Sequence, residues 1–278
     1  MSDGAATLEV AGAGAESRRA AIRAAGTGFS VGRMLAVTRK ELRSYFAFPL
    51  VYVLSGIFLV LAGYYAYSDL VYFVTIAFSR DIMQNYWQLL FSDIRLCMLL
   101  TLPFITMRLF AEERKLGTIE LLYTYPLRDG EILGGKFLAS VAIFIMMLAL
   151  TLLYPIIIYN IHWYPLFPLM AGYLGLLLIG CGFIACGVFV SSLCESQVMA
   201  GMGTITLLLF FWILNWNEAV FANSWLELIR AFSLFDQFGG FAKGVIDLGH
   251  VTYFIFFILF FLFLTQRSME ARKWTGRR

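Results

Sequence analysis

The sequence predicts an all-α integral membrane protein with six transmembrane helices, and three observations support that fold class. Of the 278 residues, 60% are hydrophobic and only 14% are charged, whereas ordinary soluble domains carry about 25% charged residues. The apolar residues fall in long runs, and about 20 helical residues cross a bilayer. Basic residues gather in segments that an even number of spans leaves on one side of the membrane. A single large soluble core is therefore excluded.

The chain begins with a tail and an amphipathic segment. Residues 1–30 are rich in Ala, Gly and Arg and lack the apolar core of a secretory signal peptide, so a flexible cytoplasmic tail is expected. Residues 31–48 place apolar side chains at helical spacing, with Arg39, Lys40 and Arg43 mainly on the other side. This pattern predicts an amphipathic helix that lies flat in the inner headgroup layer. The alternative is a soluble surface helix.

The six predicted spans contain no charged residue. They cover residues 50–67, 96–107, 137–159, 166–193, 198–214 and 251–265. The second span is short, so we expect it to borrow flanking residues and to kink at Pro103. The spans make one unit, 49–266, with a polar loop at 112–136 and an aromatic segment at 215–250. A basic tail, 267–278, follows.

The basic residues predict which loops face the cytoplasm. Seventeen of the 21 lysines and arginines lie before the first span, between spans two and three, or after the sixth. Because positive residues accumulate on the cytoplasmic side, both termini and the 112–136 loop are expected there. The aromatic segment is then external and predicts interfacial or re-entrant helices, interrupted at Gly239-Gly240. Its aromatic residues either anchor it in the interface or close an external gate, for which the candidates are Phe238, Gly239, Gly240 and Phe241.

The 112–136 loop carries the strongest functional signal. Four apolar side chains repeat at helical spacing and give a short helix one apolar face: Leu116, Ile119, Leu122 and Tyr123. Thr118 can cap this helix, Pro126 ends it, and Asp129 can cap the next one, with Glu131 near its positive end. A solvated loop needs no apolar face. The pattern therefore favours a helix that docks onto a partner protein.

Several chemistries find no support in the sequence. Residues 130–136 match most of a phosphate-binding loop, but Phe137 stands where Ser or Thr must hold Mg²⁺. Lys136 is better explained as an anchor of the third span. The four cysteines and two histidines form no metal-binding pattern, so we expect no cofactor, no metal and no catalysis in this chain. Spans free of ionisable residues also disfavour a secondary carrier.

Ten residues of the 112–136 loop follow the sequence pattern of ABC-2 type transporter permeases, and the chain resembles that family. The family pattern is an acidic pair, a Gly-Thr, a Glu before a Leu-rich turn, a Pro, and a Gly-Lys that opens the third span. The matching positions are Glu112, Glu113, Gly117, Thr118, Glu120, Leu121, Leu122, Pro126, Gly135 and Lys136. The stretch 107–136 is most similar to the gliding-motility and copper-enzyme-maturation subgroup. The basic N-terminal helix and residues 238–247 extend the resemblance.

The resemblance implies the ABC-2 exporter-type fold and the permease subunit of an ATP-driven exporter in a bacterial cytoplasmic (inner) membrane. It implies a second permease copy or paralogue and two separate ATP-binding cassette subunits, which would bind ATP and Mg²⁺. No nucleic-acid partner is expected. Coupling to the ATPase would fall to Glu112, Glu113, Gly117, Thr118, Glu120, Leu121 and Pro126. The alternative is a non-transporting membrane scaffold for a cytoplasmic ATPase.

Overall fold

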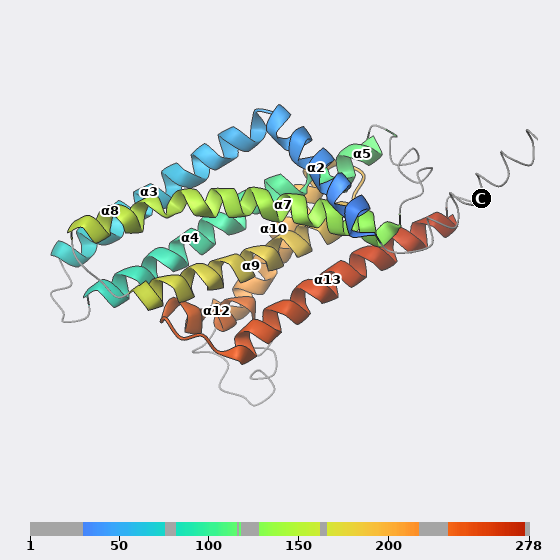
Figure 1. The fold of residues 1–278 in the computed structure, drawn as a ribbon. Coiled ribbons are helices and arrows are strands. Elements are labelled where there is room, and N and C mark those ends of the chain that lie inside the picture. Colours follow the sequence, from blue (N-terminus) through green and yellow to red (C-terminus); the bar gives the residue numbers. More distant parts are fainter. Residues whose placement is uncertain are drawn as a thin grey trace, which may run out of the picture.

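The computed structural model describes residues 30–75, 82–115, 117, 128–161, 166–216 and 233–275. Within these ranges the chain is helical and contains no strand (Figure 1), so the predicted all-α class is confirmed. The helices are α2 (Val31–Ala47), α3 (Leu50–Thr75), α4 (Ile82–Thr106), α5 (Arg108–Lys115), α7 (Asp129–Thr151), α8 (Leu153–Ile161), α9 (Leu166–Leu193), α10 (Gln197–Trp216), α12 (Leu234–Ala242) and α13 (Leu248–Thr275).

Among the described residues, five helical stretches are long and apolar enough to cross a membrane, which makes the chain a multi-pass membrane protein. They are Leu50–Thr75, Asn85–Lys115, Asp129–Tyr159, Leu166–Leu193 and Leu248–Ala271. A shorter apolar stretch, Gln197–Ile213, lies in α10. The count of six spans stays a prediction.

Four helices, α3, α4, α7 and α13, extend beyond the predicted spans and include charged residues. Asp69 lies in α3, while Asp93 and Arg95 lie in α4. The expectation of charge-free spans is therefore wrong, because a helix continues through a charged residue when its backbone hydrogen bonds continue. The sequence argument against a secondary carrier loses its support with it. Pro103 lies inside α4 as expected, and the helix is interrupted at Met107, one turn later.

Helix α9 lies in the middle of the bundle, against α4, α7, α10, α12 and α13 (Figure 1). Its glycines receive large side chains from these neighbours. A Cβ atom at Gly172 would lie 1.9 Å from the Phe91 ring, and one at Gly180 would lie 2.3 Å from the Phe144 ring. Small residues allow membrane helices to approach closely. The glycines therefore position α9 as the centre of the packing.

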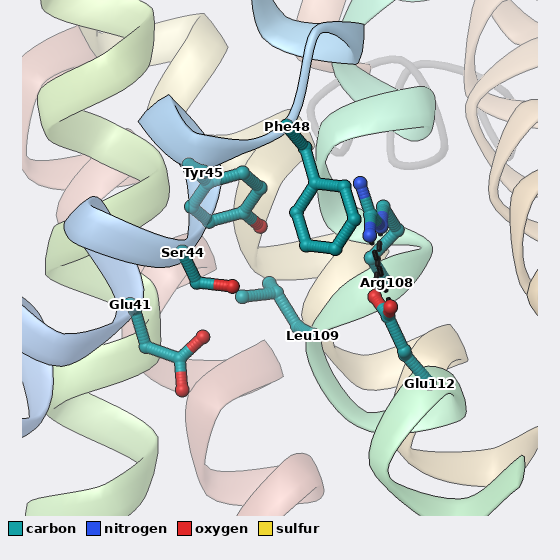
Figure 2. Close-up of a pocket in the computed structure, with 7 residues that line it drawn as sticks. All are labelled: Glu41, Ser44, Tyr45, Phe48, Arg108, Leu109 and Glu112. Atoms are coloured by element: carbon teal, nitrogen blue, oxygen red, sulfur yellow. Dashed lines mark hydrogen bonds and ion pairs between the residues drawn. The ribbon is translucent and has the colours of Figure 1, made fainter. Parts of the chain in front are cut away.

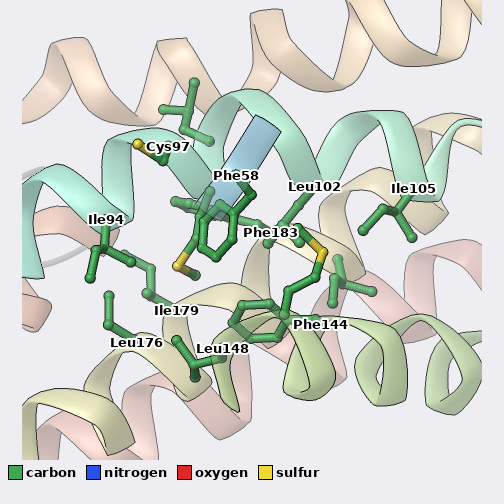
Figure 3. Packing of buried hydrophobic residues seen from close by; sticks show 14 of the residues in the cluster. Phe58, Ile94, Cys97, Leu102, Ile105, Phe144, Leu148, Leu176, Ile179 and Phe183 are labelled. Atoms are coloured by element: carbon green, nitrogen blue, oxygen red, sulfur yellow. The ribbon is translucent and has the colours of Figure 1, made fainter. Parts of the chain in front are cut away.

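Aromatic and aliphatic side chains fill the space between the helices. Figure 3 shows Phe58 of α3, Phe144 of α7 and Phe183 of α9 in this core. All three side chains are at most 1% exposed. This core holds the helices in fixed positions relative to one another. It thereby positions the charged groups at one end of the bundle.

Helix α2 packs along the first half of α7. Its surface divides into a buried face, an exposed apolar face and an exposed basic face. The face toward the protein is buried and consists of Val37, Thr38, Glu41 and Tyr45. Three of the apolar side chains that the sequence grouped together instead point outward, with Val31 56%, Leu35 54% and Phe46 42% exposed. The basic residues Arg39, Lys40 and Arg43 are exposed as well. The predicted helix is present, and its place in the headgroup layer stays a prediction.

Candidate coupling site at the junction of α2, α5 and α7

A buried lysine joins three helices at one end of the bundle. The Lys136 side chain in α7 is 1% exposed, and its Nζ lies 2.8 Å from Glu113 Oε1 of α5 and 3.2 Å from Glu41 Oε1 of α2. Nζ also donates a hydrogen bond of 2.6 Å to the Leu109 carbonyl and lies 5.2 Å from the centre of the Phe110 ring. We call Glu41, Glu113 and Lys136 the charge junction.

The residues before Lys136 explain how α2 comes close enough to reach it. A Cβ atom at Gly135 would lie 2.7 Å from the Val37 side chain, so only glycine permits this approach of α2 to α7. The Thr38 hydroxyl also donates hydrogen bonds to the Gly135 carbonyl (3.2 Å) and the Met34 carbonyl (3.0 Å). The Gly-Lys pair of the family pattern therefore has two distinct physical tasks: close helix crossing and charge bridging.

Lys40 is a second cation on the same two carboxylates. Its Nζ lies 3.3 Å from Glu41 Oε1 and 3.5 Å from Glu113 Oε1, while its side chain is 61% exposed. Burial alone would lower the pKa of Lys40, but attraction to Glu41 and Glu113 outweighs burial and raises the pKa above its ordinary value. Two carboxylates and two ammonium groups thus balance, and solvent screens only the Lys40 side.

Glu131 fixes the start of α7 and also holds the start of α2. It accepts hydrogen bonds from the backbone N–H of Ser30 (2.7 Å) and of Arg128 (3.1 Å), and it forms an ion pair of 3.0 Å with Arg33. Asp129 is the first residue of α7, after the N-cap Arg128. The prediction that Asp129 caps this helix is therefore wrong: the capping carboxylate belongs to Glu131, one turn into the helix.

Helix α5 is clamped to the end of α9 by one hydroxyl group. Ser191 Oγ accepts hydrogen bonds from the backbone N–H of Phe110 (3.2 Å) and Ala111 (3.3 Å), and it donates one to the Met107 carbonyl (3.2 Å). A second contact runs from Arg114 Nη1 to the Cys194 carbonyl (3.2 Å). We call this contact set, Ser191 and Arg114 with their partners, the α5–α9 clamp. These contacts connect the whole length of α5 to the end of α9.

A small pocket opens between α2 and α5 beside the charge junction (Figure 2). It is partly open to solvent, and its lining residues are Glu41, Ser44, Tyr45, Phe48, Arg108, Leu109 and Glu112. Arg108 holds Glu112 with two hydrogen bonds (2.7 and 2.9 Å) and lies 4.2 Å from the Phe48 ring centre. Tyr45 donates a hydrogen bond of 2.8 Å to the Ile105 carbonyl, which ties α2 to α4.

The structure places only part of the predicted coupling set. Glu112 and Glu113 lie in α5, and Gly117 follows with a φ of +67°, a conformation that favours glycine. The predicted coupling helix lies outside the described residues, and with it four of the coupling residues: Thr118, Glu120, Leu121 and Pro126. Sequence reasoning missed Glu41, although its position three residues after Thr38 and four before Tyr45 puts it on their face of α2.

The gate candidates lie in α12, far from the charge junction. Phe238 and Phe241 are fully buried, and their rings face Gly175 of α9. The expected interruption at Gly239-Gly240 is wrong, because α12 continues through both glycines to Ala242. The helix ends before Gly244, which has a φ of +82°. A role in gating stays a prediction.

A bundle of apolar, membrane-length helices with an ordered charged junction at one end defines a class, the multi-pass integral membrane proteins. The family described as ABC-2 family transporter protein matches residues 35–228. This match covers more than half of the chain, and the chain belongs to that family. The family implies partnership with an ATP-binding subunit. No curated protein matches the sequence.

The matched range begins inside α2 and includes the whole charge junction and the α5–α9 clamp. The resemblance stated from the sequence is therefore confirmed at the level of the family. The narrower similarity to the gliding-motility and copper-enzyme-maturation subgroup stays a prediction.

Proposed function

We propose that this chain is the permease subunit of an ATP-driven exporter and that the charge junction couples ATPase movement to the membrane helices. The observation that carries the proposal is the burial of Lys136 between carboxylates of α2 and α5. A buried charge with strong partners holds its helices in a defined arrangement, and loss of one partner leaves the other uncompensated. The three helices then move together when one of them is displaced.

The geometry supports a route from the predicted coupling helix into the bundle. That helix lies in the sequence between α5 and α7, so a displacement reaches α5 on one side and α7 on the other. The charge junction joins these two helices, and the α5–α9 clamp continues the connection to the central helix. Energetic coupling between distant sites requires such packed, hydrogen-bonded elements.

The proposed assembly contains two permease chains and two ATP-binding cassette subunits. ATP and Mg²⁺ bind the partner subunits, and this chain carries no cofactor and performs no hydrolysis. Both termini and the charge junction face the cytoplasm of a bacterial cell, in the inner membrane. The exposed apolar and basic faces of α2 support this placement, since such faces suit the lipid headgroup layer.

The test compares Lys136→Met with Lys40→Met in vesicles that hold the full chain and its co-purified ATPase. Both substitutions remove one ammonium group from the same two carboxylates, but only Lys136 is buried. We expect Lys136→Met to reduce ATP-driven flux at least about tenfold, because it leaves buried carboxylates unpaired, and Lys40→Met to reduce it by less than about threefold. Equal flux in the two variants would contradict the coupling role.

Glu120→Lys tests the docking helix itself. We expect reduced stimulation of the ATPase with normal membrane insertion, because the substitution reverses a charge on the proposed docking surface. Unchanged stimulation would remove Glu120 from the coupling set. If the wild-type assembly hydrolyses ATP without any flux, the scaffold function replaces the exporter function.

A further inference from the structure

Arg95 lies deep in the bundle, at a depth where a charge needs an explanation. It precedes Arg108 of the α5 helix by 13 residues, which corresponds to roughly 20 Å along a helix axis. Since Arg108 lies beside the charge junction, Arg95 falls in the far half of a hydrocarbon layer about 30 Å thick. Ionisable residues inside membrane spans are rare and mark functional sites.

The partners of Arg95 do not include an anion in direct contact. Its guanidinium carbon lies 4.8 Å from the Phe235 ring centre and 5.1 Å from the Phe238 ring centre. Its Nη1 donates one long hydrogen bond of 3.4 Å to the Phe235 carbonyl. Across the described part of the chain, Arg95 forms no ion pair. A guanidinium has five N–H donors, so the described residues engage only a small part of its capacity for binding a carboxylate or phosphate.

The first turn of α12 lies next to Arg95 and brings further donors. Ser233, the N-cap residue of α12, is 0% exposed. Its hydroxyl makes no capping bond, and Oγ is buried without a hydrogen-bond partner. Backbone N–H groups at a helix N-terminus bind anions, and the helix dipole adds positive potential.

The N-terminus of α12 lies at the middle of the bundle. Phe235 contacts Phe183, halfway along α9, with ring centres 5.9 Å apart. Past the other end of α12, a Cβ atom at Gly244 would lie 2.7 Å from Pro168, near the start of α9. Helix α12 therefore runs beside one half of α9. In transporters, the N-termini of such half-helices point at anionic groups of the substrate.

We propose that Arg95, Ser233 and the first-turn N–H groups of α12 bind the anionic headgroup of an amphiphilic substrate. The proposal rests on the proposed transport function and names its substrate class: a hydrocarbon-bearing molecule with a phosphate or carboxylate group. The guanidinium supplies paired donors in the geometry that both groups accept. The Phe235 and Phe238 rings hold the guanidinium in place by cation–π contact.

Two carboxylates near the site limit the charge that it accepts. Asp236 lies in the first turn of α12, and Asp93, two residues before Arg95, attracts the guanidinium from a distance. A third acidic residue, Asp69, lies in the neighbouring helix α3. These groups repel a further anion, so a headgroup with a single negative charge fits better than one with several. Removal of the Asp236 charge should therefore strengthen binding.

The test measures lipid retention by the purified full chain in phosphatidylcholine nanodiscs that contain one added amphiphile, counted by native mass spectrometry. Phosphatidylglycerol supplies a phosphate with one negative charge, oleate supplies a carboxylate, and diolein supplies a neutral control. We expect the protein to retain at least one of the two anionic amphiphiles in larger numbers than diolein. The anionic amphiphile that is retained in the larger number identifies the headgroup chemistry. Arg95→Gln should lower this preference at least about tenfold, the effect of losing a charge-assisted hydrogen bond.

Three further variants separate binding from folding. Asp236→Asn should raise the preference, whereas a purely structural Arg95 predicts no gain. Lys243→Gln removes an exposed cation just after α12 and should change nothing. If Arg95→Gln fails to fold, Arg95→Lys takes its place in the test. This variant keeps the charge and should retain part of the preference for the anionic amphiphile. Equal retention of all three amphiphiles by the wild type, or an unchanged preference in Arg95→Gln, would overturn the proposal.

This binding measurement needs no ATPase. A negative result therefore leaves the coupling role of Lys136 intact, and a failure of the flux experiment leaves the binding result interpretable. The two proposals fail independently.

Discussion

Lys136 illustrates how much one side chain contributes when its charge is buried. Its partners come from positions 95 residues earlier and 23 residues earlier in the chain, so its removal affects packing between helices rather than within one. Breaking a buried ion pair by removing one partner costs about 3–5 kcal/mol, whereas replacing the pair together is often close to neutral.

A double-mutant cycle on Lys136 and Glu41 tests this reasoning. Lys136→Met should lower the free energy of unfolding by about 3 kcal/mol, because two carboxylates lose their buried cation. Adding Glu41→Gln should restore part of that loss, since it removes one uncompensated charge. Reversible unfolding in detergent, followed by circular dichroism, measures both effects. Strictly additive losses would show that the two side chains do not interact.

Among the elements, α9 has the least freedom to vary, because its glycines lie directly against aromatic rings of α4, α7 and α12. Helix α3 contrasts with it. Gly56 of α3 has no atom within 4 Å of an added Cβ, and residues along this helix such as Val60 and Tyr64 are 72% and 65% exposed. Replacement of a glycine by alanine should therefore destabilise the protein in α9 and leave it unchanged or stabilise it in α3.

Gly180→Ala and Gly56→Ala form a matched pair for this comparison. At Gly180 the new methyl group would lie 2.3 Å from Phe144, and such overpacking typically costs about 1–3 kcal/mol. At Gly56 alanine should be neutral or stabilising by up to about 1 kcal/mol, because glycine disfavours helix interiors. Thermal unfolding of the two variants in the same detergent measures the difference. A destabilised Gly56→Ala would contradict the assignment of an open face.

For the whole molecule, the proposed orientation in the membrane can be tested at two exposed serines that lie at opposite ends of the bundle. Ser44 lies near the charge junction, and Ser68 lies toward the far end of α3; both are exposed. Cys97, Cys181 and Cys186 are buried and Cys194 is half-buried, so introduced cysteines should react with little background.

Labelling with a membrane-impermeant maleimide tests the predicted topology. In spheroplasts, Ser68→Cys should react and Ser44→Cys should not if the basic end faces the cytoplasm as proposed. Inverted vesicles should give the opposite pattern. Labelling of Ser44→Cys from outside would reverse the proposed orientation and place the charge junction away from any cytoplasmic ATPase.

Local patterns in the sequence predicted some elements well and could not predict others. The bounds of α9 match the predicted span because polar residues flank a continuous apolar run. The predicted spans leave out Asp69, Asp93 and Arg95 because a charged residue marks the end of an apolar run, although the second span was expected to borrow flanking residues. The contact of Glu41 with Lys136 joins residues 95 positions apart, and no local periodicity encodes such a pair. The uninterrupted course of α12 through Gly239-Gly240 depends on its packing against α9.

The α5–α9 clamp restricts which amino acids are tolerated at position 191. One oxygen there accepts from two backbone N–H groups and also donates to a carbonyl, which only a hydroxyl can do. Alanine would leave all three backbone groups without this partner, and cysteine is a weak substitute because its sulfur is larger and a poorer acceptor. Among the other residues, only threonine carries a hydroxyl group at the same distance from the backbone. Functional variants selected from a library randomised at this codon should therefore encode serine or threonine.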